Sequence, residues 1–92
     1  MRFEDLKVWR KAARLSADIY KKLRGLRDFG LKDQITRSGL SVPGNIAEGF
    51  GRFYYKDNIQ FYRVAKGSLN EIKSDIYIIL IKIIIKKCYE SN

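Results

Sequence analysis

Polar side chains recur on one side of the segment between residues 34 and 48, at helical spacing. They are Gln34, Arg37, Ser41, Asn45 and Glu48. A later segment contributes Lys66, Asn70 and Glu71. Paired carboxylates could do acid–base work or hold a hard metal ion, but neither an activated nucleophile nor a dense acidic cluster accompanies them. We therefore favour a hydrogen-bonded seam that fixes the register of two helices, made of Arg37, Asn45, Glu48, Lys66, Asn70 and Glu71.

The residue types that most catalytic and metal sites require are scarce in this sequence. The 92 residues include no histidine and a single cysteine, Cys88. Histidine is the commonest general base and metal ligand near neutral pH, and a lone cysteine excludes an intramolecular disulfide or a cysteine-rich metal site. We expect no catalytic residue, metal, cofactor or small-molecule substrate. An enzyme that uses Glu48 is the weakest of the alternatives.

Positive charge is concentrated on one stripe of the first segment. The chain carries 19 Lys plus Arg against 10 Asp plus Glu, a formal net charge of +9. On a helical wheel, six cations fall within roughly 120°: Lys7, Arg10, Lys11, Arg14, Lys21 and Lys22. Such a stripe could neutralise several phosphates of RNA or DNA. The alternatives are a solvated face that only keeps the protein in solution and a face that docks a protein partner.

Aromatic and cationic residues alternate in "FGRFYYK", residues 50–56. Bases could stack on Phe53, Tyr54 or Tyr55 while Arg52 and Lys56 meet phosphates. The alternative, which we favour for the rings, is that they close the end of a helical bundle or form a contact between subunits. Arg52 and Lys56 are kept with the six cations as candidate nucleic-acid contacts.

The segment "SVPGNIAEGFGR", residues 41–52, contains a proline and three glycines, yet it keeps helical phase. The positions in phase are Leu31, Ile35, Ser38, Val42, Ile46 and Gly49. We predict one helix over about 31–49, kinked at Pro43, in which Gly44 permits a close helix contact and Gly49 or Gly51 ends the helix in a left-handed conformation. The alternative has Ser41 as the cap of a new helix at Pro43.

Two further helices are predicted, over about residues 5–25 and 56–88. The first can begin with Glu4 or Asp5 as its cap and, if Glu4 is the cap, with Phe3 packed on Val8. The third carries an apolar stripe of Tyr62, Ala65, Leu69, Ile72, Ile76, Ile79 and Ile83. Its run "IYIILIKIII", residues 76–85, has about half the roughly 20 residues of a membrane-spanning helix. We expect no membrane segment, but this run needs a covering surface, supplied by self-association, by a partner protein or by the core.

Three separated motifs resemble one bacterial family of small four-helix-bundle proteins. They are "FEDLKVWRKA" (3–12), "SVPGNIAEGFGR" (41–52) and "AKGSLNEI" (65–72). The family is that of the 23S rRNA-intervening sequence proteins, and it is similar to the accessory variability determinant of diversity-generating retroelements. The resemblance implies an antiparallel bundle assembled into a homopentamer and, for the retroelement branch, a basic surface that contacts nucleic acid and reverse transcriptase. Members usually continue through a fourth helix, whereas this chain ends at Asn92.

Together these patterns predict a single all-α domain over residues 1–92. We expect an antiparallel up-and-down bundle of the four-helix-bundle type, truncated to three helices, that forms a homo-oligomer in the cytoplasm. The predicted function is non-enzymatic, with a basic surface that contacts RNA or DNA. The alternative is an interaction or assembly adaptor whose basic face docks a protein partner.

Overall fold

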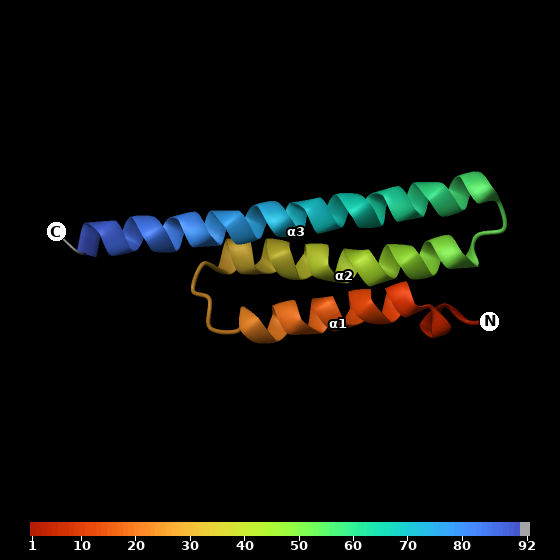
Figure 1. Cartoon of the computed structure of the whole chain (residues 1–92), viewed down its shortest axis with the longest axis horizontal. Helices are drawn as coiled ribbons and strands as arrows, with labels where there is room; N and C mark the ends of the chain where they lie inside the picture. Colours follow the sequence, from red (N-terminus) through yellow and green to blue (C-terminus); the bar gives the residue numbers. More distant parts are fainter. Residues whose placement is uncertain (91–92) are drawn as a thin grey trace.

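The computed structural model describes residues 1–90, which form one short 3-10 helix and three α-helices (Figure 1). The 3-10 helix η1 spans Phe3–Asp5, and the α-helices are α1 (Lys7–Lys22), α2 (Phe29–Gly51) and α3 (Tyr55–Glu90). No strand occurs within these residues. The predicted all-α class is therefore confirmed.

The three α-helices run alternately up and down, with α2 between α1 and α3 (Figure 1). Within the described chain, no Cα atom of α1 lies within 8 Å of one in α3, so α2 alone joins the two outer helices along their backbones. The molecule measures 59 × 22 × 19 Å. Its length comes from α3, whose C-terminal part extends past both neighbours (Figure 1).

The core follows the central helix. Its buried apolar side chains are Ala12 and Ile19 from α1, Ile35, Val42 and Ile46 from α2, and Ala65 and Ile72 from α3. The stripe predicted for α2 is confirmed, since Ser38 and Gly49 are buried as well and Leu31 packs against the core. Because α2 is covered from two sides, its buried surface is broader than that of either neighbour.

The stripe predicted for α3 is only half correct. Ala65 and Ile72 are buried and Ile79 packs against the core, but Tyr62, Leu69, Ile76 and Ile83 remain substantially exposed. The face that meets α2 is rotated toward Ser68 and Asp75, which are both buried. These positions alternate with Ala65 and Ile72 in the three–four spacing of helices that pack side by side.

The beginning and end of α1 differ from the prediction. Phe3 lies against Trp9 in an edge-to-face contact with 5.1 Å between ring centroids, whereas Val8 is exposed, so the predicted Phe3–Val8 contact is wrong. Leu6 occupies the cap position and makes no side-chain cap hydrogen bond, so neither Glu4 nor Asp5 caps α1. The helix ends at Lys22 rather than near residue 25.

The central helix is continuous through Pro43, which excludes a new helix starting there. It starts at Phe29, two residues before the predicted start, because the Asp28 carboxylate accepts a hydrogen bond from the Leu31 N–H at 3.1 Å. No glycine within residues 1–90 has a positive φ, so the predicted left-handed stop is wrong. Instead, Arg52 turns to an extended conformation and donates its N–H to the Gly49 carbonyl at 3.2 Å.

The close helix contact predicted at Gly44 is also wrong. A Cβ added there would have no atom within 4 Å, and the residue is exposed. Close approaches occur instead at Gly39, where a Cβ would lie 3.4 Å from the Ile19 side chain, and at Gly49 beside α3.

Candidate functional site

The basic stripe of α1 faces solvent along the whole helix. All six of its cations are exposed: Lys7, Arg10, Lys11, Arg14, Lys21 and Lys22. None of the six forms an ion pair with a carboxylate in the described part of the chain. Asp18 is the only acidic residue of α1, and it is exposed on the same face. At 1.5 Å per residue, the 16 residues of α1 present this charge over about 24 Å.

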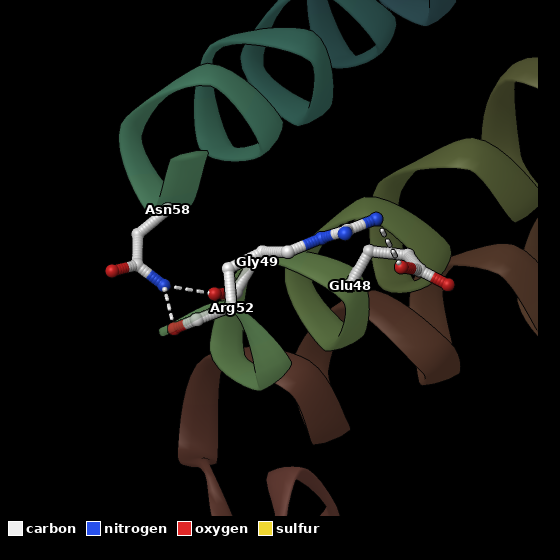
Figure 2. Close-up of polar contacts among 4 residues, drawn as sticks. All are labelled: Glu48, Gly49, Arg52 and Asn58. Atoms are coloured by element: carbon white, nitrogen blue, oxygen red, sulfur yellow. Dashed lines mark hydrogen bonds and ion pairs between the residues drawn. The ribbon is translucent and has the colours of Figure 1, made fainter. Parts of the chain in front are cut away.

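Arg52 and Lys56 lie apart from this stripe, at the connection between α2 and α3. The Arg52 guanidinium lies 3.2 Å from the Glu48 carboxylate (Figure 2). It also lies 4.7 Å from the centroid of the Phe61 ring. Its charge is therefore partly compensated. Lys56 is exposed in the first turn of α3. This connection is at the end of the molecule where α1 begins (Figure 1).

The rings of the same connection do not close the end of the bundle. Phe53, Tyr54 and Tyr55 are 92%, 68% and 77% exposed. Phe53 and Tyr54 touch each other edge to face, with centroids 5.2 Å apart. The predicted packing of these rings within the chain is wrong, so they are available to contact another molecule.

A polar seam joins α2 to α3, through a partly different set of residues from the one predicted. Gln34 donates to Asp75 Oδ1 at 2.8 Å, and Ser38 donates to Glu71 Oε2 at 3.0 Å. Further along, Ser68 donates to Ser41 Oγ at 2.8 Å. Asn45 steadies the same hydroxyl by donating to it at 2.9 Å. Together these bonds link the two helices over several turns.

The structure brings only two of the six predicted seam residues into this network, Asn45 and Glu71. Arg37 instead pairs with Asp33 within α2 at 3.2 Å, and Glu48 pairs with Arg52. Lys66 lines an apolar groove on another side of α3, and Asn70 is exposed. The polar side of α2 therefore turns partly toward solvent.

Asp75 belongs to the seam although it was not among the predicted seam residues. It is 3% exposed, and its Oδ2 atom has no hydrogen-bond partner in residues 1–90. The signal that could have revealed it is its spacing of seven from Ser68 and of three from Ile72, which places it on the buried side. Within the same residues, no group of three Asp, Glu, Cys or His side chains could hold a metal ion.

Asn58 makes a second contact that sequence reasoning missed. From the first turn of α3, its side-chain amide donates to the carbonyls of Gly49 and Arg52, the latter at 3.1 Å (Figure 2). These carbonyls lie at the C-terminal end of α2, where helices leave acceptors unsatisfied. The amide therefore ties the start of α3 to the end of α2.

Asp28 ties the other end of α2 to α3. Its Oδ2 lies 2.7 Å from Lys82 Nζ, while Oδ1 accepts from the Leu31 N–H. The hydrogen bond from Lys82, followed by that from Leu31, lowers the pKa of the Asp28 carboxyl below its ordinary value of 3.8.

An apolar groove of about 590 Å³ opens between α1 and α3, with α2 as its floor. Its walls include Val8 and Leu15 on one side and Tyr62 and Leu69 on the other. All four of these side chains are at least one-third exposed. None of the helices within residues 1–90 has an apolar stretch that would cross a bilayer.

Residues 4–90 match the family model described as 23S rRNA-intervening sequence protein. No curated protein and no solved structure is significantly similar. The family match covers nearly all of the chain, including two of the three residues of η1 and all three α-helices. The chain therefore belongs to the 23S rRNA-intervening sequence protein family.

Proposed function

We propose that this protein is a non-enzymatic, homo-oligomeric helical-bundle protein of the cytoplasm whose α1 surface contacts RNA or DNA. One observation carries the proposal: six exposed cations share one face of α1 and none has a carboxylate partner within residues 1–90. A solvated face that served only solubility would tolerate interspersed carboxylates. Here Asp18 is the single acidic residue of the helix.

The length of the stripe suits a polyanion better than a small anion. Its cations are spread over about 24 Å, a distance along which a nucleic-acid backbone presents several phosphates. Each lysine or arginine that meets a phosphate releases condensed counterions, so affinity falls steeply as salt rises. The exposed rings of Phe53, Tyr54 and Tyr55 offer additional stacking surface for unpaired bases beside Lys56.

The proposal is tested with labelled single-stranded RNA and, in parallel, duplex DNA of random sequence. Binding is measured by fluorescence anisotropy over a series of salt concentrations. The triple variant Lys7→Gln, Arg10→Gln, Arg14→Gln should weaken binding at least tenfold. It should also reduce the slope of log K against log salt by about one unit for each phosphate that the variant no longer neutralises.

The control variant removes the same charge from other faces, through Arg37→Gln, Arg63→Gln and Lys86→Gln. These three side chains are exposed on α2 and α3, so the control should keep most of the affinity and most of the salt slope. Equal losses in both triple variants would show that only net charge matters. That result, or binding that does not change with salt, would contradict the proposal.

The apolar groove favours a second candidate, an assembly adaptor whose basic face docks a protein partner. Open apolar surface between helices is typical of docking sites. Purification from the native cell distinguishes the two candidates. A stoichiometric protein partner that remains bound in the absence of nucleic acid would favour the adaptor.

A further inference from the structure

Three consecutive aromatic rings project into solvent from the connection between α2 and α3. They belong to Phe53, Tyr54 and Tyr55, each of which has at least 68% of its surface exposed. No aromatic side chain within residues 1–90 is more exposed than Phe53, at 92%. Rings gathered at the surface in this way are typical of contact sites, because each of them holds a large apolar area in water.

Hydrogen bonds within the chain hold the backbone that carries these rings. The Asn58 amide donates to the carbonyls of Gly49 and Arg52 (Figure 2). The Tyr54 carbonyl accepts from the N–H groups of Asp57 and Asn58 at 3.1 and 3.2 Å. The rings are therefore displayed from a fixed backbone, and a ligand that stacks on them loses little affinity to the ordering of the connection.

Positive charge lies beside the rings and continues onto α1. Lys56 directly follows Tyr55; it is exposed and forms no ion pair with a carboxylate within residues 1–90. Asp57, the acidic residue of this turn, points about 100° away from Lys56 around the helix. Because α1 begins at the same end of the molecule (Figure 1), Lys7 and Arg10 bring the basic stripe to the end that carries the rings. A polyanion that follows the stripe toward the start of α1 is thus led to this connection.

Unpaired bases suit these rings better than a duplex does. Every base has a flat face that can stack on an aromatic ring, whatever the sequence. Within a duplex both faces are already covered by neighbouring bases, so a base must be flipped out of the helix to reach a ring, at the cost of its pairing and stacking. A single strand presents its bases without this cost, and its phosphates can still meet the lysines and arginines of α1.

We propose that the nucleic acid bound by this protein is a single strand, whose phosphates lie on the basic stripe of α1 and whose unpaired bases stack on Phe53, Tyr54 and Tyr55. This inference rests on the proposed contact with RNA or DNA and adds to it the class of nucleic acid and a second contact site. Single-stranded RNA and single-stranded DNA share the required chemistry. Because the rings neutralise no phosphate, they contribute affinity that does not depend on salt.

The test compares single strands with a duplex in a variant that lacks the rings, Phe53→Ala, Tyr54→Ala, Tyr55→Ala. The ligands are a labelled RNA of about 15 nucleotides, the DNA strand of the same sequence and the duplex of that DNA strand, a length that covers a typical single-strand site. In fluorescence anisotropy, the variant should bind single strands at least tenfold more weakly than the wild type and the duplex within twofold as well. Its salt slope should be unchanged, in contrast to that of the α1 variant. A loss with either RNA or DNA supports the proposal and identifies the strand.

The matched control removes three exposed rings from the other end of the molecule, through Phe29→Ala, Tyr77→Ala and Tyr89→Ala. These side chains are 74%, 57% and 79% exposed. The control should bind every ligand as the wild type does. Circular dichroism should show wild-type helix content in both triple variants, because all six rings lie at the surface.

An abasic strand with the same number of phosphates isolates the stacking. The wild type should bind the abasic strand about as weakly as the ring variant binds the ordinary strand, and the ring variant should not distinguish the two strands. Equal losses for single strands and duplex in the ring variant, or an abasic strand bound as tightly as the ordinary one, would overturn this inference and leave the contact with α1 intact. Binding of none of these nucleic acids would overturn the proposed function as well.

Discussion

Gly49 and Tyr62 mark a point where α2 and α3 approach too closely for a side chain on α2. A Cβ added to Gly49 would lie 2.7 Å from Cε1 of Tyr62 and 3.1 Å from Cβ of Phe61. The Tyr62 ring could turn away into the groove, but the Phe61 Cβ is fixed to the backbone of α3. The helices therefore need glycine here for packing, not for a left-handed turn.

Gly49→Ala should destabilise the protein by about 1–2 kcal/mol, because the cost of overpacking exceeds the gain in helix propensity of about 1 kcal/mol. The matched control is Gly44→Ala in the same helix, where an added Cβ meets nothing within 4 Å. That change should stabilise the protein by about 0.5–1 kcal/mol. Urea unfolding followed by circular dichroism measures both, and a Gly49→Ala protein as stable as Gly44→Ala would refute the close contact.

The existence and order of the three α-helices were predictable because each carries a long apolar repeat. The apolar repeat of α2 keeps its helical phase across Pro43. A loop inserted there would have shifted Ile46 and Gly49 relative to Val42. The kink expected at Pro43 stays a prediction. The helix ends were less predictable because they depend on single hydrogen bonds, such as the one from Leu31 to Asp28.

The polar seam was only partly predictable, because the type of a polar residue does not indicate whether its side chain faces a neighbouring helix or water. Arg37 pairs with Asp33 one turn earlier in α2, and Glu48 pairs with Arg52 just after the end of α2. Asp75 is charged, as residues on the exposed side of a helix usually are, but it lies in the interface between α2 and α3. The decisive quantity is the rotation of α3 about its axis, which is set by the packing of Ala65 and Ile72 against α2. For the same reason, the sequence did not reveal which half of the α3 stripe remains open.

Asp75→Asn should raise the free energy of unfolding by about 1 kcal/mol. The carboxyl of Asp75 is buried, and its Oδ2 atom has no partner in residues 1–90, so this oxygen carries a desolvation cost that the hydrogen bond from Gln34 to Oδ1 does not offset. Asparagine keeps an oxygen that can accept the hydrogen bond from Gln34, and it replaces the ionisable carboxyl with a neutral amide. Asp75→Ala is the comparison, because it leaves the Gln34 amide without an acceptor and opens a void. Urea titrations at neutral pH should rank the asparagine variant above the wild type and the wild type above the alanine variant, and a less stable asparagine variant would contradict the assignment.

The contribution of Asp28 to stability should depend on pH in the acidic range. Because the pKa of its carboxyl is lowered in the folded protein, the stabilisation is complete above about pH 4 and is lost as the pH falls through the lowered pKa. Asp28→Asn keeps an N-cap for α2 but loses the ion pair with Lys82. The stability difference between wild type and Asp28→Asn should therefore be constant from neutral pH to about pH 4 and should shrink below it.

Carboxyl NMR titration provides the independent measurement of Asp28. In the wild type it should titrate below 3.8, and in Lys82→Gln it should move back toward that value, because the largest cause of the shift is the bond from Lys82. A wild-type pKa at or above 3.8 would show that Lys82 and Asp28 do not pair in solution.

Asn58→Asp should destabilise the protein more than Asn58→Ala does, although aspartate usually stabilises the first turn of a helix. A carboxylate there gains about 0.3–1 kcal/mol from the helix dipole. At this position, however, it would face the carbonyl oxygens of Gly49 and Arg52, to which the amide of Asn58 now donates (Figure 2). Losing two donated bonds costs about 1–3 kcal/mol, and repulsion between oxygens adds to this only in the aspartate variant. At neutral pH the aspartate variant should unfold at a lower urea concentration than the alanine variant, and the gap should close as the new carboxyl protonates. An aspartate variant as stable as wild type would show that α2 and α3 are not joined through these carbonyls.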